Sequence, residues 1–161
     1  MALSVFGTGT FTATGAPAAG ATLVVGGTTY TWRATVGATA NEIFIGATTT
    51  ANAQNIFDAV NATPAALGVT VGSATVRNPE AKALKSVGPV VTVISGVPGV
   101  VGNRVPTSSS TANVAASGAT LASGAGSLDL DLLGNLNSMQ MPASVAEVFK
   151  KVITGTEVAP S

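Results

Sequence analysis

The clearest pattern in the chain is an alternation of apolar and polar residues over 21–34, ATLVVGGTTYTWRA, on both sides of a glycine pair. This alternation predicts a β-hairpin, because successive side chains of a strand point to opposite faces. If the two glycines form the turn, Leu23 lies opposite Tyr30, and Trp32 falls on the same face. That face is large and apolar, so we expect it to be buried as core.

Shorter β-rich stretches predict the other strands. They cover residues 3–15, 43–45, 68–76 and 90–96, followed by a Pro/Gly turn and a polar edge strand within 97–114. These stretches are rich in Val, Ile, Phe and Thr and are bounded by Gly and Pro, which is typical of strands joined by tight turns.

The pattern changes period over residues 49–62, TTANAQNIFDAVNA. Thr49 or Thr50 can cap the start of a helix there, and Pro64 follows its end. We therefore predict one amphipathic helix packed on the sheet. Its apolar stripe has the helical spacing i, i+3, i+4, i+7 and consists of Ala53, Ile56, Phe57 and Val60.

The densest charge cluster, 77-RNPEAKALKSVG-88, lies between two predicted strands. A solvated loop or helical turn is the simplest interpretation. The alternative is a partner-binding loop, because connections often carry function. In that case Arg77, Lys82 and Lys85 are the candidate contacts.

From residue 115 the composition becomes Ala-, Gly- and Ser-rich, which favours a flexible segment over 115–127 and a division into 1–114 and 115–161. Residues 144–153, SVAEVFKKVI, begin with an S-x-x-E capping box and predict a short helix. Such a short helix must dock, either on its own domain or on a partner. Its candidate contacts are Val145, Val148, Phe149 and Val152.

Charge and residue usage narrow the range of functions that the chain could have. The chain of 161 residues has seven basic and seven acidic residues, only 9% charged in all, so we expect no nucleic-acid or membrane partner. Cys and His are absent, which excludes Cys/His and Ser/His/Asp catalysis and thiolate metal sites. The start lacks a basic region followed by an apolar run, so no secretory signal is expected.

Weaker chemical patterns do not change this interpretation. The glycines at 7 and 9 lack the third glycine and the helix of a dinucleotide loop. A Ser86–Lys85 dyad has no oxyanion-hole signal beside it. Asp129 and Asp131 share one side of a predicted strand, where a solvated surface is a simpler explanation than a Ca²⁺ site. We expect a non-enzymatic protein with no catalytic residues, no cofactor and no small-molecule substrate.

Together the patterns predict an α+β, mainly β domain. An antiparallel, sandwich-like sheet carries one packed helix near residues 50–62, and a C-terminal arm with a short helix follows.

Three segments resemble a small domain common among virion proteins of tailed bacteriophages. They are residues 7–32, 41–62 and 91–105, and the resemblance covers about residues 7–111. The G-G-x-x-Y-x-W and P-G-x-x-G-N motifs are its most specific parts. The resemblance implies a virion structural module, often a head decoration (cement) protein. Residues 77–88 and those from 115 onward depart from it.

The resemblance supports two hypotheses, and a third comes from another class of protein. The first is a decoration protein on the capsid exterior, made in the host cytoplasm, that binds the major capsid protein and itself as a homo-oligomer. The second is a tail, neck or fibre module of the virion. The third is a host-surface or carbohydrate-binding β-domain that uses Trp32 as a stacking platform.

Overall fold

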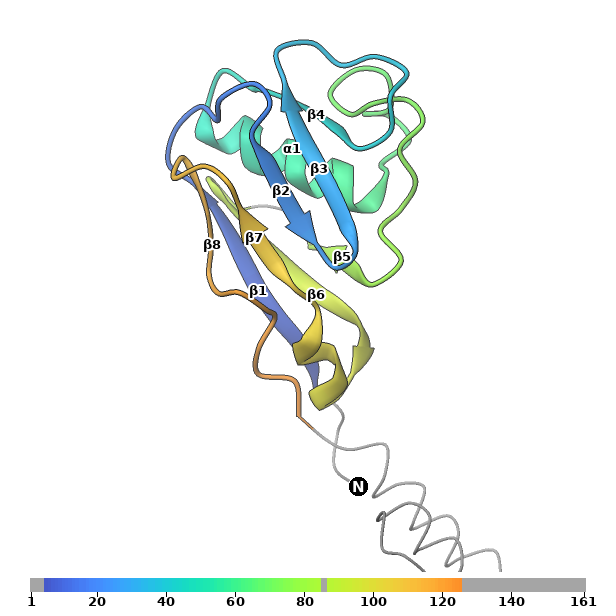
Figure 1. Cartoon of the computed structure of the whole chain (residues 1–161), viewed down its shortest axis with the longest axis vertical. Helices are drawn as coiled ribbons and strands as arrows, with labels where there is room; N and C mark the ends of the chain where they lie inside the picture. The colour runs from blue at the N-terminus through green and yellow to red at the C-terminus, as the bar shows by residue number, and fades with distance from the viewer. Residues whose placement is uncertain (1–4, 85–86, 126–161) are drawn as a thin grey trace, which may run out of the picture.

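The computed structural model describes residues 5–84 and 87–125 and shows an α+β, mainly β domain (Figure 1). One sheet has the strand order β5-β6-β1-β8 and the other β4-β3-β2-β7. All pairings are antiparallel except β3 with β4. The strands are β1 (Phe6–Ala13), β2 (Thr22–Val25), β3 (Thr28–Arg33), β4 (Glu42–Phe44), β5 (Ala81–Ala83), β6 (Val90–Pro98), β7 (Thr107–Ser109) and β8 (Val114–Ala116).

The predicted hairpin is confirmed. β2 and β3 pair with Leu23 opposite Tyr30, and the pair Val25–Thr28 closes the turn. Leu23, Tyr30 and Trp32 are fully buried, because this face of the hairpin turns toward the interior. The large side chains of a chain otherwise rich in small residues therefore supply the centre of the core.

The predicted helix is also confirmed, as α1 (Thr49–Asn61). Its cap is Thr48, one residue earlier than predicted: the Thr48 hydroxyl accepts a hydrogen bond from the amide of Ala51 at 3.1 Å. Of the predicted stripe, Ile56 and Val60 are fully buried, whereas Phe57 is half-buried at the edge of the core.

Asparagines on α1 connect the two sheets where their edges separate. Asn55 donates to the carbonyl of Phe44 on β4 at 2.8 Å. Asn61 both donates to the carbonyl of Ala83 on β5 and accepts from its amide, at 2.9 and 3.1 Å. The helix thereby satisfies polar edge groups of both sheets. At the opposite edges of the two sheets, β7 and β8 approach each other (Figure 1).

Two predicted segments differ in the structure. Residues 68–76 form turns and isolated bridges in place of a strand, and Val69 and Val76 are exposed. In the charged stretch, β5 pairs with β6, so this segment is not wholly a loop. The alternation over 68–76 predicted a strand that finds no pairing partner, and the charge density over 77–88 hid one that does. Neither local pattern shows which residues will pair.

The flexible segment predicted from residue 115 is wrong for residues 115–125. β8 pairs with β1, and Leu121 is 1% exposed in the core. Further on, the amide of Ala125 donates to the carbonyl of Val5. The remaining C-terminal arm, with its predicted helix, lies outside the described residues.

Candidate functional site

The start of the predicted contact loop 77–88, residues 77–80, is held in place by Asn78, which is 4% exposed. Its amide nitrogen donates to the carbonyl of Val25 at 2.9 Å and to the hydroxyl of Tyr30 at 3.2 Å. Its oxygen accepts from the amides of Glu80 and Ala81. Burial raises the pKa of Tyr30, and the hydrogen bond from Asn78 lowers it in part. The hairpin thus anchors the loop.

The loop forms one wall of a hollow with a volume of about 340 Å³. The structure brings together two of the predicted contact residues here, because Lys82 on β5 and Arg77 at the start of the loop both line it. Asn78, Pro79, Ala81 and Gly96 complete the lining. We call this space the basic hollow.

A second hollow of about 320 Å³ shares Pro79 and Gly96 with the basic hollow. Its other lining residues are Glu80, Val97, Val101, Arg104 and Val105, and its accessible lining is mainly apolar. We call it the apolar hollow, and the two together the groove. The groove therefore combines a cationic half with a valine-lined half.

The far wall of the apolar hollow is η1 (Val100–Arg104), a 3-10 helix packed closely on β1 and β6. A Cβ on Gly102 would collide with Ser95 and with the carbonyl of Val97. Ser95 is itself engaged there, accepting from the amide of Gly7 at 3.0 Å and donating to the carbonyl of Val97. The P-G-x-x-G-N motif therefore shapes this wall, because only glycine permits the close approach.

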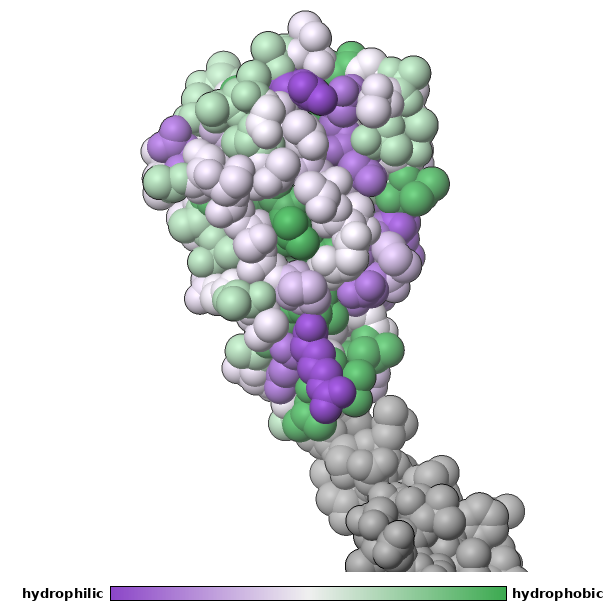
Figure 2. All heavy atoms as spheres, in the orientation of Figure 1, coloured by the Kyte–Doolittle hydropathy of each residue, from purple (hydrophilic) through white to green (hydrophobic). Residues whose placement is uncertain are grey.

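Beside the groove, this end of the domain exposes a cluster of large apolar side chains. Figure 2 shows hydrophobic surface there around a hydrophilic strip. We call the cluster the apolar end; its members are Val5, Phe6, Val97, Val100 and Val101, which are 40–57% exposed. A concentration of this kind is typical of a protein-contact surface, because single exposed apolar residues are normal whereas contiguous ones are not.

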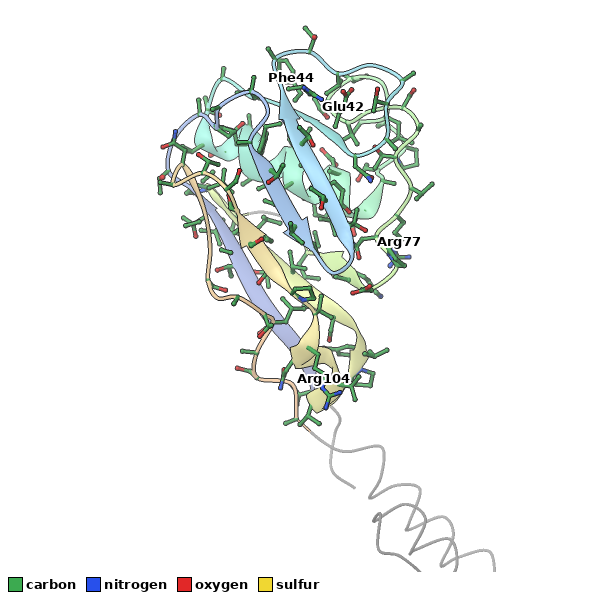
Figure 3. All side chains as sticks on the ribbon, in the orientation of Figure 1. Glu42, Phe44, Arg77 and Arg104 are labelled. Atoms are coloured by element: carbon green, nitrogen blue, oxygen red, sulfur yellow. The ribbon has the colours of Figure 1, made fainter. Side chains whose placement is uncertain are left out.

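Positive charge concentrates at the groove. The described chain has four basic residues, of which Arg33 pairs with Glu42 at 3.3 Å near the opposite end of the domain. The other three line the groove, Arg77 and Lys82 in the basic hollow and Arg104 in the apolar hollow. Figure 3 labels Arg77 and Arg104. Glu80 is the single carboxylate among the lining residues. The groove is therefore cationic on a nearly uncharged molecule.

Several other candidates fall elsewhere. Lys85, the Ser86–Lys85 dyad, the Asp129–Asp131 pair and the helix contacts Val145, Val148, Phe149 and Val152 lie outside the described residues. The stacking platform assigned to Trp32 is wrong, because its ring is fully buried. The groove residues Val97, Val101 and Arg104 were missed as contacts, although the PGVVGNR stretch placed two valines and a cation in a turn.

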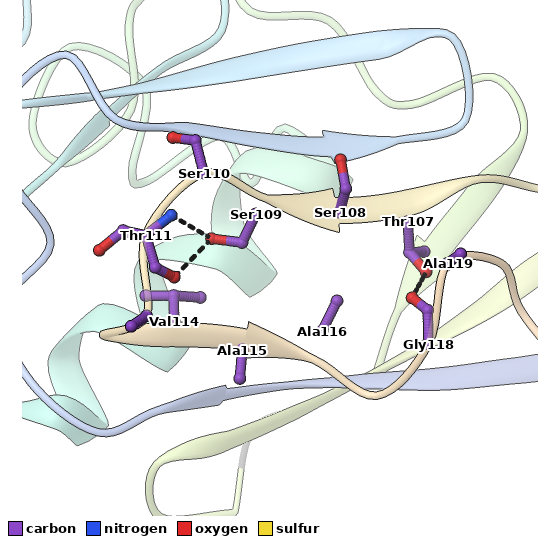
Figure 4. Close-up of a pocket in the computed structure, with 11 residues that line it drawn as sticks. Thr107, Ser108, Ser109, Ser110, Thr111, Val114, Ala115, Ala116, Gly118 and Ala119 are labelled. Carbon is purple, nitrogen blue, oxygen red and sulfur yellow. Dashed lines mark hydrogen bonds between the residues drawn. The ribbon is translucent and has the colours of Figure 1, made fainter.

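A third hollow, of about 450 Å³, lies between β7 and β8 (Figure 4). The Thr107 hydroxyl donates to the carbonyl of Gly118 at one end, and Ser109 bonds to Thr111 at the other. The lining consists of Ser, Thr, Ala, Gly and Val residues. Without an ionisable group, this hollow offers hydroxyl contacts but no acid–base chemistry.

Within residues 5–84 and 87–125, no three His, Cys, Asp or Glu residues lie close enough together to hold a metal ion. The helices of the same ranges include none that is long and apolar enough to cross a membrane. Comparison with models of known protein families and with curated proteins finds no match. The groove and the apolar end are the arrangement on which a functional proposal can rest.

Proposed function

We propose that this chain is a non-enzymatic structural protein of a bacteriophage virion. In this role it decorates the capsid exterior and bridges neighbouring major capsid subunits. The observation that carries the proposal is the apolar end, a set of exposed valines and a phenylalanine on β1 and the residue before it, on β6 and on η1. The resemblance of residues 7–111 to virion domains supplies the biological setting.

Adhesion at such a surface would come from burial of apolar side chains. Each fully buried valine or phenylalanine contributes about 1.5–3 kcal/mol before the costs of association are subtracted. A single contact of this size is weak, but many identical contacts on one shell, or a homo-oligomer with several such ends, gain strength by multivalency. The low charge of the chain keeps the desolvation cost small.

The test is the copy number of the chain in purified particles of the phage that encodes it, by quantitative mass spectrometry. We expect a number comparable to that of the major capsid protein. A number smaller by one or two orders of magnitude would indicate a tail, neck or fibre module. Absence from the particle would refute the virion assignment.

A deletion of residues 128–161 tests the role of the C-terminal arm in capsid binding and oligomerisation. We expect the shortened chain to keep its thermal unfolding transition and to bind capsids more weakly or lose its oligomeric state. Full binding with an unchanged oligomeric state would remove the arm from the proposal.

A further inference from the structure

The basic hollow brings two like charges together without an anion among its lining residues. Arg77 and Lys82 both line it, and its remaining lining residues carry no charge. Both cations are exposed to solvent. Two cations at one concave site raise the local positive potential, and each repels the other unless a negative charge compensates them. The hollow therefore attracts an anionic group.

The described residues, 5–84 and 87–125, include three carboxylates, and none of them lines the basic hollow. Glu42 pairs with Arg33 at 3.3 Å, and Asp58 accepts a hydrogen bond on α1. Glu80 lines the apolar hollow, and a Cβ on Gly26 would collide with its carboxylate, so this side chain lies over the turn of the hairpin. Within the described part of the chain, both cations of the basic hollow are thus left for an external group.

The donors that the basic hollow offers are mainly side chains, because most of its backbone amides are already bonded. The amides of Asn78, Ala81 and Gly96 all donate to other groups of the chain, and Pro79 has no amide proton. Phosphate sites usually employ several free backbone amides, whereas a carboxylate can be bound by a guanidinium and an ammonium group alone. The chemistry of the hollow therefore favours a carboxylate.

Arg77 and Lys82 stand on backbone that is already fixed. Arg77 precedes Asn78, whose side chain is bonded to the hairpin. Lys82 is the central residue of β5 and pairs with Ile94 of β6. Only the two side chains must become ordered when a ligand binds, which keeps the entropic cost of binding low.

We infer that the basic hollow receives the carboxylate of an acidic side chain, Asp or Glu, from a partner protein. The Arg77 guanidinium supplies a planar pair of donors, and the Lys82 ammonium supplies a second cation. The apolar hollow shares two lining residues with the basic hollow, so apolar side chains next to that carboxylate would meet its valines. The inference defines the chemistry of the partner and holds whether or not the partner is a capsid subunit.

NMR titration of the full-length, isotope-labelled chain tests the inference. The probe is glutamate with its α-amino group acetylated and its α-carboxyl group amidated, so that the side-chain carboxylate is its only charge. We expect saturable shifts of the Arg77 Nε–H signal and of the amide signals of residues 80–82. The Kd should lie in the millimolar range, as for one exposed charge contact. The corresponding glutamine compound lacks the charge and should cause no such shifts.

The test variant is Arg77→Gln with Lys82→Gln, followed at the amide of Ala81. It should bind the probe at least about fivefold more weakly, because both charged donors are removed. The matched control is Arg33→Gln, since Arg33 is also exposed but is already paired with Glu42. Its affinity for the probe should equal that of the parent chain. Thermal unfolding of each variant checks that it remains folded.

Three results would overturn the inference: no saturable shift at the basic hollow, equal binding of the glutamine compound, or an unchanged affinity in the test variant. Inorganic phosphate is titrated in parallel, and tighter binding of phosphate than of the probe would overturn the assignment of a carboxylate. Raising the salt concentration should weaken binding of the probe, as expected for exposed charges. The measurement needs no phage particle, so this inference and the virion assignment can fail separately.

Discussion

Asn78 donates a hydrogen bond to the hydroxyl of Tyr30, so the loop that lines the groove is fastened to the centre of the core. The same amide reaches the carbonyl of Val25, and its oxygen holds the amides of Glu80 and Ala81. One buried side chain therefore satisfies groups on the hairpin and on the loop at once. Stability and the shape of the groove are coupled through it.

Asn78→Ala should destabilise the domain by about 3 kcal/mol, since it leaves several buried polar groups without a partner. Urea unfolding measures this difference directly. The matched control is Asn113→Ala, whose side chain is exposed and donates to the carbonyl of Ala16; its cost should stay below about 1 kcal/mol. Similar losses for the two variants would contradict the anchoring role of Asn78.

Two glycines in neighbouring turns should respond differently to the same change. A Cβ on Gly72 would collide with the carbonyl of Thr39, whereas a Cβ on Gly37 meets open space. Gly72→Ala should lower the melting temperature by several degrees or more, and Gly37→Ala should leave it nearly unchanged. A tolerated Gly72→Ala would show that the two turns can separate at little cost.

On α1, Ile56→Ala should destabilise more than Phe57→Ala. Ile56 is fully buried, so its truncation leaves a cavity and should cost about 3–4 kcal/mol. Phe57 is half-buried and should cost about 2 kcal/mol. Chemical denaturation of both variants gives the order, and the reverse order would mean that Phe57 carries the helix contact.

Alkaline pH should weaken the fold through Tyr30. Burial raises the pKa of Tyr30 in the folded state, so the proton is held more tightly there than in the unfolded chain. This contribution is complete below pH 10.0, the ordinary tyrosine pKa, and is lost as pH rises toward the folded-state pKa. Because Tyr30 is the chain's single tyrosine, absorbance follows its ionisation alone.

The control for this pH dependence is Tyr30→Phe. The variant differs from the parent chain only by the phenol hydroxyl, so the difference between the two proteins isolates the contribution of Tyr30. The loss between pH 9 and 11 should be smaller in the variant, which lacks the phenol. Identical losses would show that Tyr30 does not contribute.

The apolar end should matter for association and not for folding. Val100→Ser should weaken self-association or capsid binding several-fold with little change in melting temperature, because Val100 is 57% exposed. Val69→Ser is the control, since Val69 is 68% exposed on another part of the surface. Sedimentation velocity and capsid co-sedimentation compare the two. Equal effects would remove the apolar end as the contact surface.

Prediction from sequence succeeded where the pattern was local. The hairpin over 21–34 and the helix over 49–61 each contain their own turn or cap and their own periodicity, so neighbouring residues carried the signal. It failed for β5 and β8. Their short Ala-rich sequences become strands only because β6 and β1 offer edges to pair with.

The candidate site was predicted only in part. Arg77 and Lys82 stood out because charge is rare in this chain, and they line one hollow. The valine-lined half was not predicted. It forms where η1 and β6 pack beside the loop at 77–80, and these segments are far from that loop in sequence. The buried asparagines were also missed, since their partners lie far away in sequence.

The sequence by itself determined a β-rich chain with an amphipathic helix over 49–61, an aromatic core and little charge, since composition and short-range periodicity suffice for these. Only the tertiary structure decided which small residues become strands, where the apolar surface stays exposed and that three cations line the two neighbouring hollows beside it. Those features depend on contacts between segments far apart in the chain. Such contacts are set by packing of the whole domain, and no local pattern encodes them.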